Sequence, residues 1–354
     1  MNFRKVMPLI LVLVAAFGGI VTLSSSGNHS SAPATAFAPL QGSLTETTPP
    51  AEGDNVVHVG LYGTNVYELS FEDNTFYFSG YLWMRWRDAD LAPTSTLEFV
   101  NAVETWGLMI TPLTEEPEQL ANGEYVQTMS VQGRFYKTFQ LGDYPLDSQT
   151  LSIMIEDSTN NSDTVVYTPD DGQTGIDPNM KVQGFDVAGI SSQNFVHNYG
   201  TSFGYEGVTD NQKYSAIEFR VHIDRNPNLF LWKLLLPLLL VLITNWLTLM
   251  MNPKYVEVRT AMPATALLTT VFLQMAAMES VSQSSTLVLM DKIYLVAYAS
   301  IVLTLAQVIF DNRAVQDPTE EQLEAVAKRD RVSLAVQSVV TIGILLALIL
   351  PRLM

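Results

Sequence analysis

The sequence predicts an extracellular antiparallel β-sandwich followed by a four-helix transmembrane bundle, and three observations lead to this fold class. The 354 residues divide by charge, because residues 39–225 carry 8 Lys and Arg against 27 Asp and Glu, whereas the remainder carries 11 against 9. The acidic part is built of short alternating runs. The last third holds four apolar segments, near the ~20 residues that cross a bilayer. An acidic, water-exposed half is therefore joined to an apolar half.

The first residues have the features of an export signal. Arg4 and Lys5 precede an apolar run over residues 6–23, and small-residue cleavage patterns follow within residues 34–38. The run is also long enough for an uncleaved anchor. Residues 1–36 are therefore predicted to be a signal peptide or signal anchor, and 37–53, rich in Ser, Thr, Pro and Ala, a linker.

Residues 54–226 are predicted to form the extracellular β-sandwich, a ligand-binding domain. Runs such as NTFYFSGYLWMRWRD (74–88) and KYSAIEFRVHID (213–224) alternate apolar and polar residues between clusters of Asn, Gly, Asp and Pro. Such runs at this spacing are typical of an antiparallel sandwich. The one helical pattern in this part is a short segment near Gln119.

Residues 227–354 are predicted to be a transmembrane domain. The second of its four segments is the unusual one, because it contains Thr265, Thr269, Thr270 and Gln274. A span with this many polar side chains seldom faces lipid on all sides, so it should line a wet surface. The predicted helices cover about 229–251, 257–279, 291–311 and 330–351.

The loops between these segments predict their orientation. Lys254 and Arg259 follow the first segment, and Arg313, Lys328, Arg329 and Arg331 follow the third. The positive-inside rule places both basic loops in the cytoplasm. The predicted location is a multi-pass protein of the cell (inner) membrane, with the sandwich on the periplasmic or extracellular side.

Composition and motifs exclude several function classes. No stretch is basic enough to bind a phosphate backbone, so nucleic acid is excluded as a partner. Without cysteine there is no disulfide, thiol nucleophile or thiolate metal site. The four histidines share no metal-ligand spacing, and GxSxG, HExxH and P-loop motifs are absent. The chain is predicted not to be an enzyme and to need no cofactor, and the sequence assigns no metal site.

Several motifs resemble those of pentameric ligand-gated ion channels, and they occur in the order found in that family. Residues 144–149 (YPLDSQ) resemble the aromatic-Pro-x-Asp centre of its signature loop, and residues 86–88 resemble its Trp-x-Asp. Arg225 resembles the arginine before the membrane, Pro237 the proline within the first span, and residues 257–273 the pore helix.

The resemblance covers about residues 54–351 and is to the prokaryotic branch of the Cys-loop receptor superfamily. Lys137 and Leu151 stand where animal receptors have cysteines, as in the disulfide-free bacterial members. Ser158 stands where many relatives carry an aromatic that cages a ligand amine. The resemblance implies four identical subunits as partners, making a ring of five. It also implies permeant cations, membrane lipid, and a small extracellular ligand, proton or divalent cation as modulator.

One face of the second span is predicted to line the pore. Residues spaced by three or four positions share a helix face, and five copies of such a face stack into rings. Rings of Leu267 and Val271 would close the pore by dewetting; the alternatives are ordinary packing for Leu267 and a hydroxyl bonded to its own helix for Thr260. Arg259, about 200° around the helix from Glu257, should point off the axis. The predicted pore-lining residues are Glu257, Thr260, Ala264, Leu267, Val271, Gln274 and Met278.

Two further groups follow from the resemblance. Arg225 among carboxylates is expected to be a partly desolvated ion pair, or alternatively a headgroup-facing anchor. Tyr81 is expected to meet an aromatic hairpin of the neighbouring subunit. The gating-coupling group is Glu72, Asp73, Tyr144, Pro145, Asp147, Arg225, Leu287 and Asp291. The ligand-binding group is Tyr81, Tyr199, Phe203, Tyr205 and Tyr214.

These features predict a homopentameric ligand-gated ion channel, cation-selective because of Glu257 and opened by an extracellular signal. The alternative is a non-conducting membrane sensor or transporter with an exported β-sandwich binding module. A single polar span favours a pore, because transporters usually spread polar breaks over paired repeats. A membrane-tethered adhesive sandwich would need one span, not four. Protons or divalent cations are candidate signals for so acidic a domain.

Overall fold

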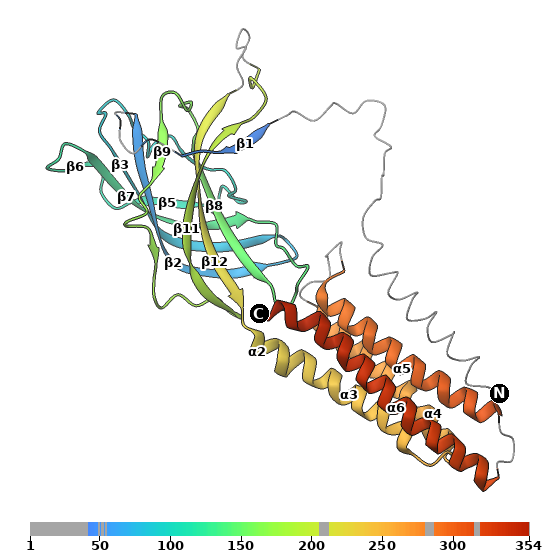
Figure 1. Ribbon diagram of the computed structural model, residues 1–354. Coiled ribbons are helices and arrows are strands. Elements are labelled where there is room, and N and C mark those ends of the chain that lie inside the picture. The colour runs from blue at the N-terminus through green and yellow to red at the C-terminus, as the bar shows by residue number, and fades with distance from the viewer. Residues whose placement is uncertain are drawn as a thin grey trace. The chain divides into compact units, whose positions relative to one another are not determined.

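The computed structural model describes residues 42–48, 50, 53, 55–204, 212–279, 287–314 and 319–353 (Figure 1). The chain divides into two compact units, one of them Pro39–Leu229 and the other Phe230–Glu279 with Leu287–Met354. The predicted signal segment, Tyr205 and most of the loop between the second and third spans lie outside the described residues.

The first unit is a sandwich of two sheets, which confirms the predicted fold class for this half. Of the ten strand pairings within the described residues, eight are antiparallel, and the other two are the parallel pairings of β9 and β10 with β2. One sheet has the order β1 (Ser43–Glu46), β11 (Phe185–Asn198), β12 (Lys213–Arg225), β8 (Ser148–Asp157), β4 (Leu97–Phe99). The other has the order β10 (Gly175–Ile176), β2 (Val56–Ser70), β3 (Thr75–Trp86), β7 (Tyr125–Tyr136), β5 (Met109–Pro112), with β6 (Glu118–Gln119) on β7 and β9 (Val166–Pro169) on β2.

The core of the sandwich lies between the two sheets and is set by period-two patterning. On β3, Phe76, Phe78 and Leu82 are fully buried, and they pack in one cluster with Ile153 of β8 and Phe219 of β12. The residues between them point to the other face of the sheet. A one-residue shift of register would move every buried side chain of β3 into water, so the register is strongly specified.

The second unit holds four helices long and apolar enough to cross a membrane, which confirms the predicted class for the other half. The first span begins with the π-helical turn η2 (Phe230–Leu235) and continues as α3 (Leu236–Leu247) and the 3₁₀ turn η3 (Thr248–Met250). The short helix α2 (Pro227–Leu229) precedes it, at the end of the first unit. Pro237 follows η2 and cannot donate to the carbonyl of Lys233, so the regular α-helical bond pattern is interrupted there.

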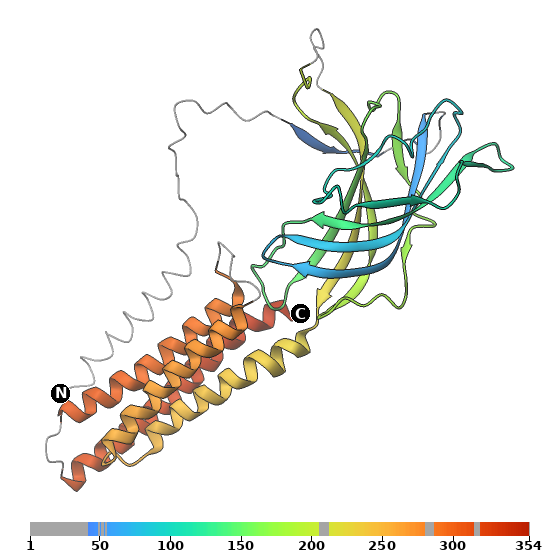
Figure 2. The same cartoon turned by 180° about the vertical axis from the view of Figure 1, so that it is seen from behind.

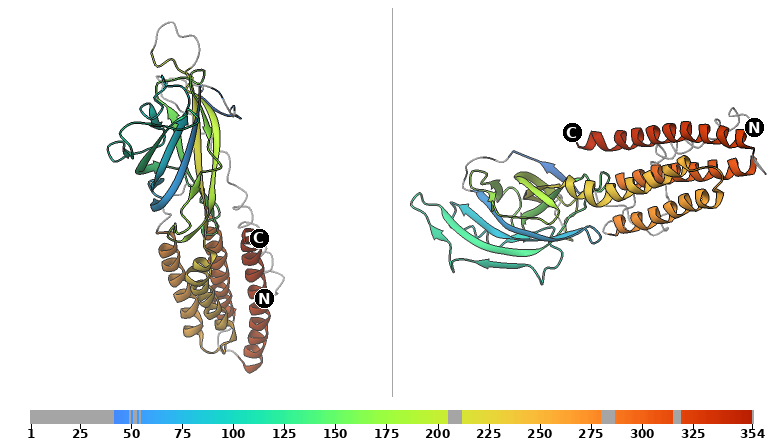
Figure 3. Two further views of the ribbon diagram at one scale, coloured as in Figure 1. Left: turned by 90° about the vertical axis from the view of Figure 1, so that its left-hand side faces the viewer. Right: turned by 90° about the horizontal axis from the view of Figure 1, so that it is seen from below.

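The other three spans are long helices: α4 (Val256–Met278), α5 (Leu289–Ala314) and α6 (Glu320–Ile349), closed by the 3₁₀ turn η4 (Leu350–Arg352). They lie side by side with α3 (Figure 2). α6, dark red, packs along α5 on the outside of the bundle in both views of Figure 3.

Two local predictions differ from the structure. α6 begins at Glu320, ten residues before the predicted start at 330, because Thr319 and Gln322 form a reciprocal capping box. The segment near Gln119 is not a helix, since Glu118 and Gln119 pair with β7 as a short strand. Whether so short a segment forms a helix or a strand depends on the element it pairs with, and sequence periodicity does not show that element.

Candidate functional site

The first candidate site is the face of α4 that points away from its own bundle. Arg259, Pro263, Ala266, Thr270 and Ala277 are buried and mark the packed face. Residues two positions before or after these lie roughly opposite them, since each residue turns the helix by about 100°. The largest of these are Leu268, Phe272 and Met275, which are 56%, 61% and 65% exposed. The exposed residues of α4 and its C-terminal cap include Glu257, Val258, Ala261, Ala264, Thr265, Leu268, Thr269, Val271, Phe272, Met275, Ala276 and Glu279.

The exposed face overlaps the predicted pore stripe only in part. Glu257, Ala264 and Val271 are exposed, whereas Thr260, Leu267, Gln274 and Met278 are half-buried. The predicted residues recur every 3.5 positions, and a straight α-helix drifts by about 20° per heptad from that repeat. This drift is small, and Thr260 in the first turn is already half-buried. Thr260, Leu267 and Gln274 form a row about 60° from that of Glu257, Ala264 and Val271, and this row lies nearer the packed face.

Gln274 belongs to this half-buried row, and its side chain is engaged by its own bundle. Its Oε1 accepts a hydrogen bond from Tyr298 Oη at 2.6 Å, and its Nε2 donates to Asp291 Oδ1 at 3.3 Å. Asp291 Oδ2 also accepts from the backbone N–H of Val288 at 3.2 Å. The hydrogen bond between Gln274 and Asp291 thus links α4 to the start of α5. Leu287, which precedes α5, is exposed.

The threonines of α4 share one arrangement. Each hydroxyl lies within 2.8–2.9 Å of the carbonyl oxygen four residues earlier: Thr260 on Val256, Thr265 on Ala261, Thr269 on Thr265, and Thr270 on Ala266. This is the alternative considered for Thr260. Thr265 and Thr269 are nevertheless exposed on the face that the bundle leaves open.

The second candidate site surrounds Arg225 at the end of β12. Its Nε and Nη2 donate to the two carboxylate oxygens of Asp147 at 2.7 and 3.2 Å, and its backbone N–H donates to the Asp147 carbonyl at 3.1 Å. The guanidinium carbon lies 4.3, 4.9 and 5.1 Å from the ring centroids of Phe185, Tyr144 and Phe71. The side chains of Arg225 and Asp147 are 11% and 2% exposed. The structure therefore brings together three predicted coupling residues as a largely desolvated ion pair within an aromatic cage.

The remaining coupling residues of the sandwich lie next to this cage in the chain. Glu72 and Asp73 are in the turn between β2 and β3, where Asp73 accepts a hydrogen bond from Ser70 Oγ at 2.9 Å. Phe71 of the same turn is one of the three cage rings. The cis peptide bond before Pro145 shapes the loop that carries Tyr144 and Asp147.

The third candidate site is an aromatic cluster around a buried carboxylate. The ring of Tyr199 lies 5.1 Å from Phe203, 5.8 Å from Tyr214 and 3.9 Å from His197. Glu156 is buried beneath them, accepts a hydrogen bond from the Tyr199 hydroxyl, and lies 2.9 Å from His197 Nδ1. Burial, together with this bond to Glu156, raises the pKa of Tyr199 well above its usual range. Tyr81 is half exposed on β3, in the other sheet.

Sequence reasoning missed Glu156 and His197. No sequence motif marks these two residues. The sheet brings them together, because Glu156 on β8 and His197 on β11 both pair with β12, opposite Ala216 and Tyr214. A carboxylate as buried as that of Glu156 needs hydrogen-bonding partners. The partners come from 41 and 43 residues away.

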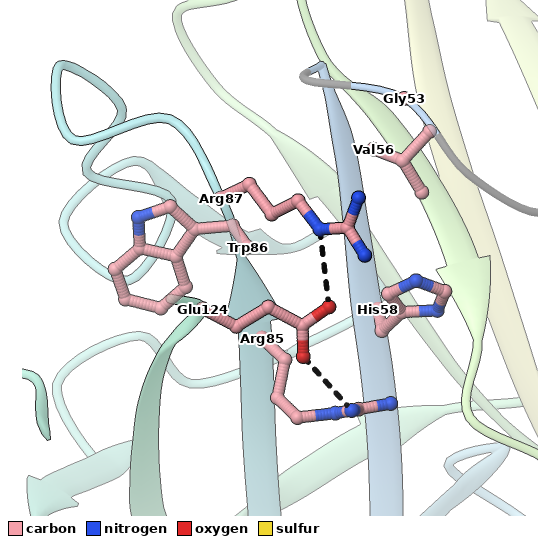
Figure 4. Close-up of a pocket in the computed structure, with 7 residues that line it drawn as sticks. All are labelled: Gly53, Val56, His58, Arg85, Trp86, Arg87 and Glu124. Atoms are coloured by element: carbon pink, nitrogen blue, oxygen red, sulfur yellow. Dashed lines mark hydrogen bonds and ion pairs between the residues drawn. The ribbon is translucent and has the colours of Figure 1, made fainter. Parts of the chain in front are cut away.

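A charged pocket of about 240 Å³ lies on the sandwich at the end of β3 (Figure 4). Trp86 points into the core, so its neighbours Arg85 and Arg87 point out of it, and both converge on Glu124, with N–O distances of 3.2 and 3.4 Å. Burial alone would raise the pKa of Glu124, but a hydrogen bond from Asn122 and the two guanidinium groups lower it below its ordinary value. Within the described residues, no group of three His, Asp or Glu side chains is arranged to hold a metal ion.

Comparison with known proteins gives a distant relative. The chain matches no known family model. It is similar to a proton-gated ion channel of Gloeobacter violaceus, with 21% identity over 228 residues, which are 59% of this chain and 60% of that protein. The chain thus spans about 60% of the length of the relative it matches. Together with the sandwich and the four apolar helices, this similarity supports the resemblance to ligand-gated ion channels at a coarse level.

Proposed function

We propose that the chain is one subunit of a homopentameric ligand-gated channel that conducts cations across the cell membrane. The observation that carries the proposal is the exposed face of α4. It presents the charged Glu257 and the hydroxyls of Thr265 and Thr269 on a helix of membrane-spanning length. Polar and ionised groups within a span are costly against lipid and usually face a bundle interior or a water-filled cavity. Five copies around an axis would hide this face from lipid and form that cavity.

The proposed rings follow the exposed face. Glu257 is in the first turn of α4, where the helix dipole stabilises a carboxylate. Rings of acidic residues favour cations in pores, and rings of apolar residues can gate by dewetting. Leu268 and Phe272 are exposed on the same face as the predicted Val271, which supports all three for the apolar constriction. Leu267 is half-buried, so Leu268 is favoured over it.

The proposed route of opening begins in the sandwich. Arg225 precedes the first span in sequence and is held by Asp147 of the signature-like loop. A signal that shifts this loop would therefore act on the residue next to the membrane span. The similarity to a proton-gated channel and the acidic domain both support protons as the signal, with a small ligand at the Tyr199 cluster as the second candidate.

Reconstitution of the purified full-length chain in liposomes tests the function. We expect a detergent mass of five chains, currents evoked by a fall in external pH, and a reversal potential near that of Na⁺ in a NaCl gradient. A stable monomer or dimer would remove the basis for the pore. An assembled ring without conductance, across pH and ligand screens, would favour the sensor or transporter alternative.

Paired variants test the gate. Leu268→Ser should ease opening, with a raised basal leak and a lower signal concentration for half-activation, because a hydroxyl stabilises water in the constriction. Leu267→Ser is the matched control, since the same change is made one position away on a half-buried side chain. Equal effects of both variants, or a larger effect at Leu267, would contradict the assignment of the exposed face to the pore.

A further inference from the structure

A buried ion pair joins the start of α4 to α6. Arg259 Nη2 lies 2.5 Å from Asp330 Oδ2, and the side chains are 3% and 0% exposed. Gln307 of α5 donates from Nε2 to the other carboxylate oxygen, Asp330 Oδ1, at 2.7 Å. Three helices therefore meet at one carboxylate, and its two oxygens are both engaged.

Arg259 depends on this carboxylate alone for its counter-charge. Its Nε has no hydrogen-bond partner among the described residues, and its only ion pair within them is with Asp330. A buried charge whose partner is removed is strongly unfavourable, because it was desolvated on folding and is no longer compensated. A long arginine side chain in that situation turns its guanidinium towards water.

The position of Arg259 on α4 makes its charge relevant to the exposed face. It is the one basic residue of α4, and Glu257, two residues earlier, is the one acidic residue. The two point to nearly opposite sides of the helix, Arg259 into the bundle and Glu257 outwards. Without Asp330, the first turn of α4 would have no net charge. With Asp330 bound to Arg259, the charge of Glu257 remains uncompensated.

We propose that Asp330 determines ion selectivity from outside the pore helix, by holding Arg259 in the bundle and neutralising it. This inference rests on the proposed channel function. Asp330 is a positioning residue, since it acts on permeant ions through Arg259 and Glu257. In a ring of five it keeps five positive charges away from the five carboxylates at the mouth.

Reversal potentials in a NaCl gradient test this role. Asp330→Asn keeps the size of the side chain and the hydrogen bond to Arg259, but removes the counter-charge. We expect the Na⁺/Cl⁻ permeability ratio to fall by about tenfold, because the released Arg259 offsets Glu257 at short range. The double variant Arg259→Gln with Asp330→Asn should restore the wild-type ratio, since the positive charge has gone.

A matched control separates selectivity from stability. Asp311 of α5 is also buried and pairs with Arg329 of α6, but neither residue belongs to α4. Asp311→Asn should leave the permeability ratio unchanged, whatever it does to current size. If Asp330→Asn alone fails to reach the surface, its co-expression with wild-type subunits gives mixed rings, in which a graded fall of the ratio is expected.

The outcomes distinguish the two proposals. A wild-type channel that reverses at the chloride potential, or does not conduct, would overturn the proposed function itself. A cation-selective wild type whose ratio is unchanged in Asp330→Asn, alone or in mixed rings, would overturn only the role of Asp330. Failure of the double variant to restore the ratio would also overturn it, because the effect would then not pass through Arg259.

Discussion

The two units each contain a desolvated Arg–Asp pair, and the pairs are built differently. Arg225 donates twice to Asp147 and lies near three aromatic rings, whereas Arg259 contacts Asp330 through one nitrogen and leaves Nε without a partner in the described part of the chain. Aromatic faces attract a cation, with about 0.5–2 kcal/mol for each contact. The charge of Arg225 is therefore shared among several partners, but that of Arg259 rests on one carboxylate.

The largest expected effect comes from breaking the pair in the bundle. Asp330→Ala should destabilise the protein by about 3–5 kcal/mol, the usual cost of stranding one buried charge. Replacing both residues, as Arg259→Met with Asp330→Leu, should recover most of the loss, because no charge remains buried. Thermal melting in detergent measures both. A double variant as unstable as the single one would show that the pair is needed for packing rather than for charge compensation.

The second prediction concerns gating through the sandwich pair. Arg225→Ala should abolish or strongly reduce signal-evoked current while surface assembly stays intact, because the link between Asp147 and the start of the first span is lost. Surface biotinylation alongside voltage clamp measures both quantities. Currents like those of the wild type would reduce Arg225 to an anchor that faces lipid headgroups.

The third prediction tests the aromatic cage. Arg225→Lys keeps the charge and the attraction to the rings of Phe185 and Tyr144, but loses the two-pronged contact with Asp147. We expect an intermediate phenotype, with current retained and the half-activating signal about tenfold higher, since one charge-assisted hydrogen bond is worth about 1.5–3 kcal/mol. A lysine variant as inactive as Arg225→Ala would mean that the cage contributes little.

The smallest effect is expected at Glu124, where two arginines share one carboxylate near the surface. Its lowered pKa means that Glu124 stabilises the sandwich above its unfolded-state pKa near 4.5, and that this contribution is lost as the pH falls through the lower folded value. Glu124→Gln should therefore be less stable than the wild type at pH 7 and lose less stability on acidification. Melting curves between pH 3 and pH 7 check the sign, and parallel losses in both proteins would contradict it.

The two pairs also show what sequence can and cannot predict. Arg225 and Asp147 were both predicted, because each lies in a short local motif. Arg259 was expected to point away from Glu257, which follows from helix geometry alone and agrees with its burial. Its partner Asp330 lies 71 residues further along the chain, on a helix predicted to begin at that very residue. Nothing local indicates which of several acidic residues meets Arg259.

The fold was predictable because both halves have strong periodic signals, whereas the finer features depend on packing. Alternation on β3 predicts its buried face, and the length of the apolar segments predicts the spans. Gln274 was predicted to line the pore because a repeat of three and four residues allows two neighbouring faces. The contacts of Gln274 with Tyr298 and Asp291 show that its side chain lies towards the packed face. Glu156 was missed because its partners, His197 and Tyr199, are also distant in the sequence and are brought to it only by packing.

In the proposed channel, the threonine hydroxyls of α4 have a consequence for what an ion meets on this face. A hydroxyl has one proton, and in Thr265 and Thr269 that proton is directed to a backbone carbonyl of the same helix. What remains on the outer side is oxygen lone pairs. A cation that gives up water molecules in the proposed pore finds oxygen atoms like those of its own hydration shell. An anion finds no free hydroxyl proton on these two threonines to replace the hydrogen bonds that it loses with water.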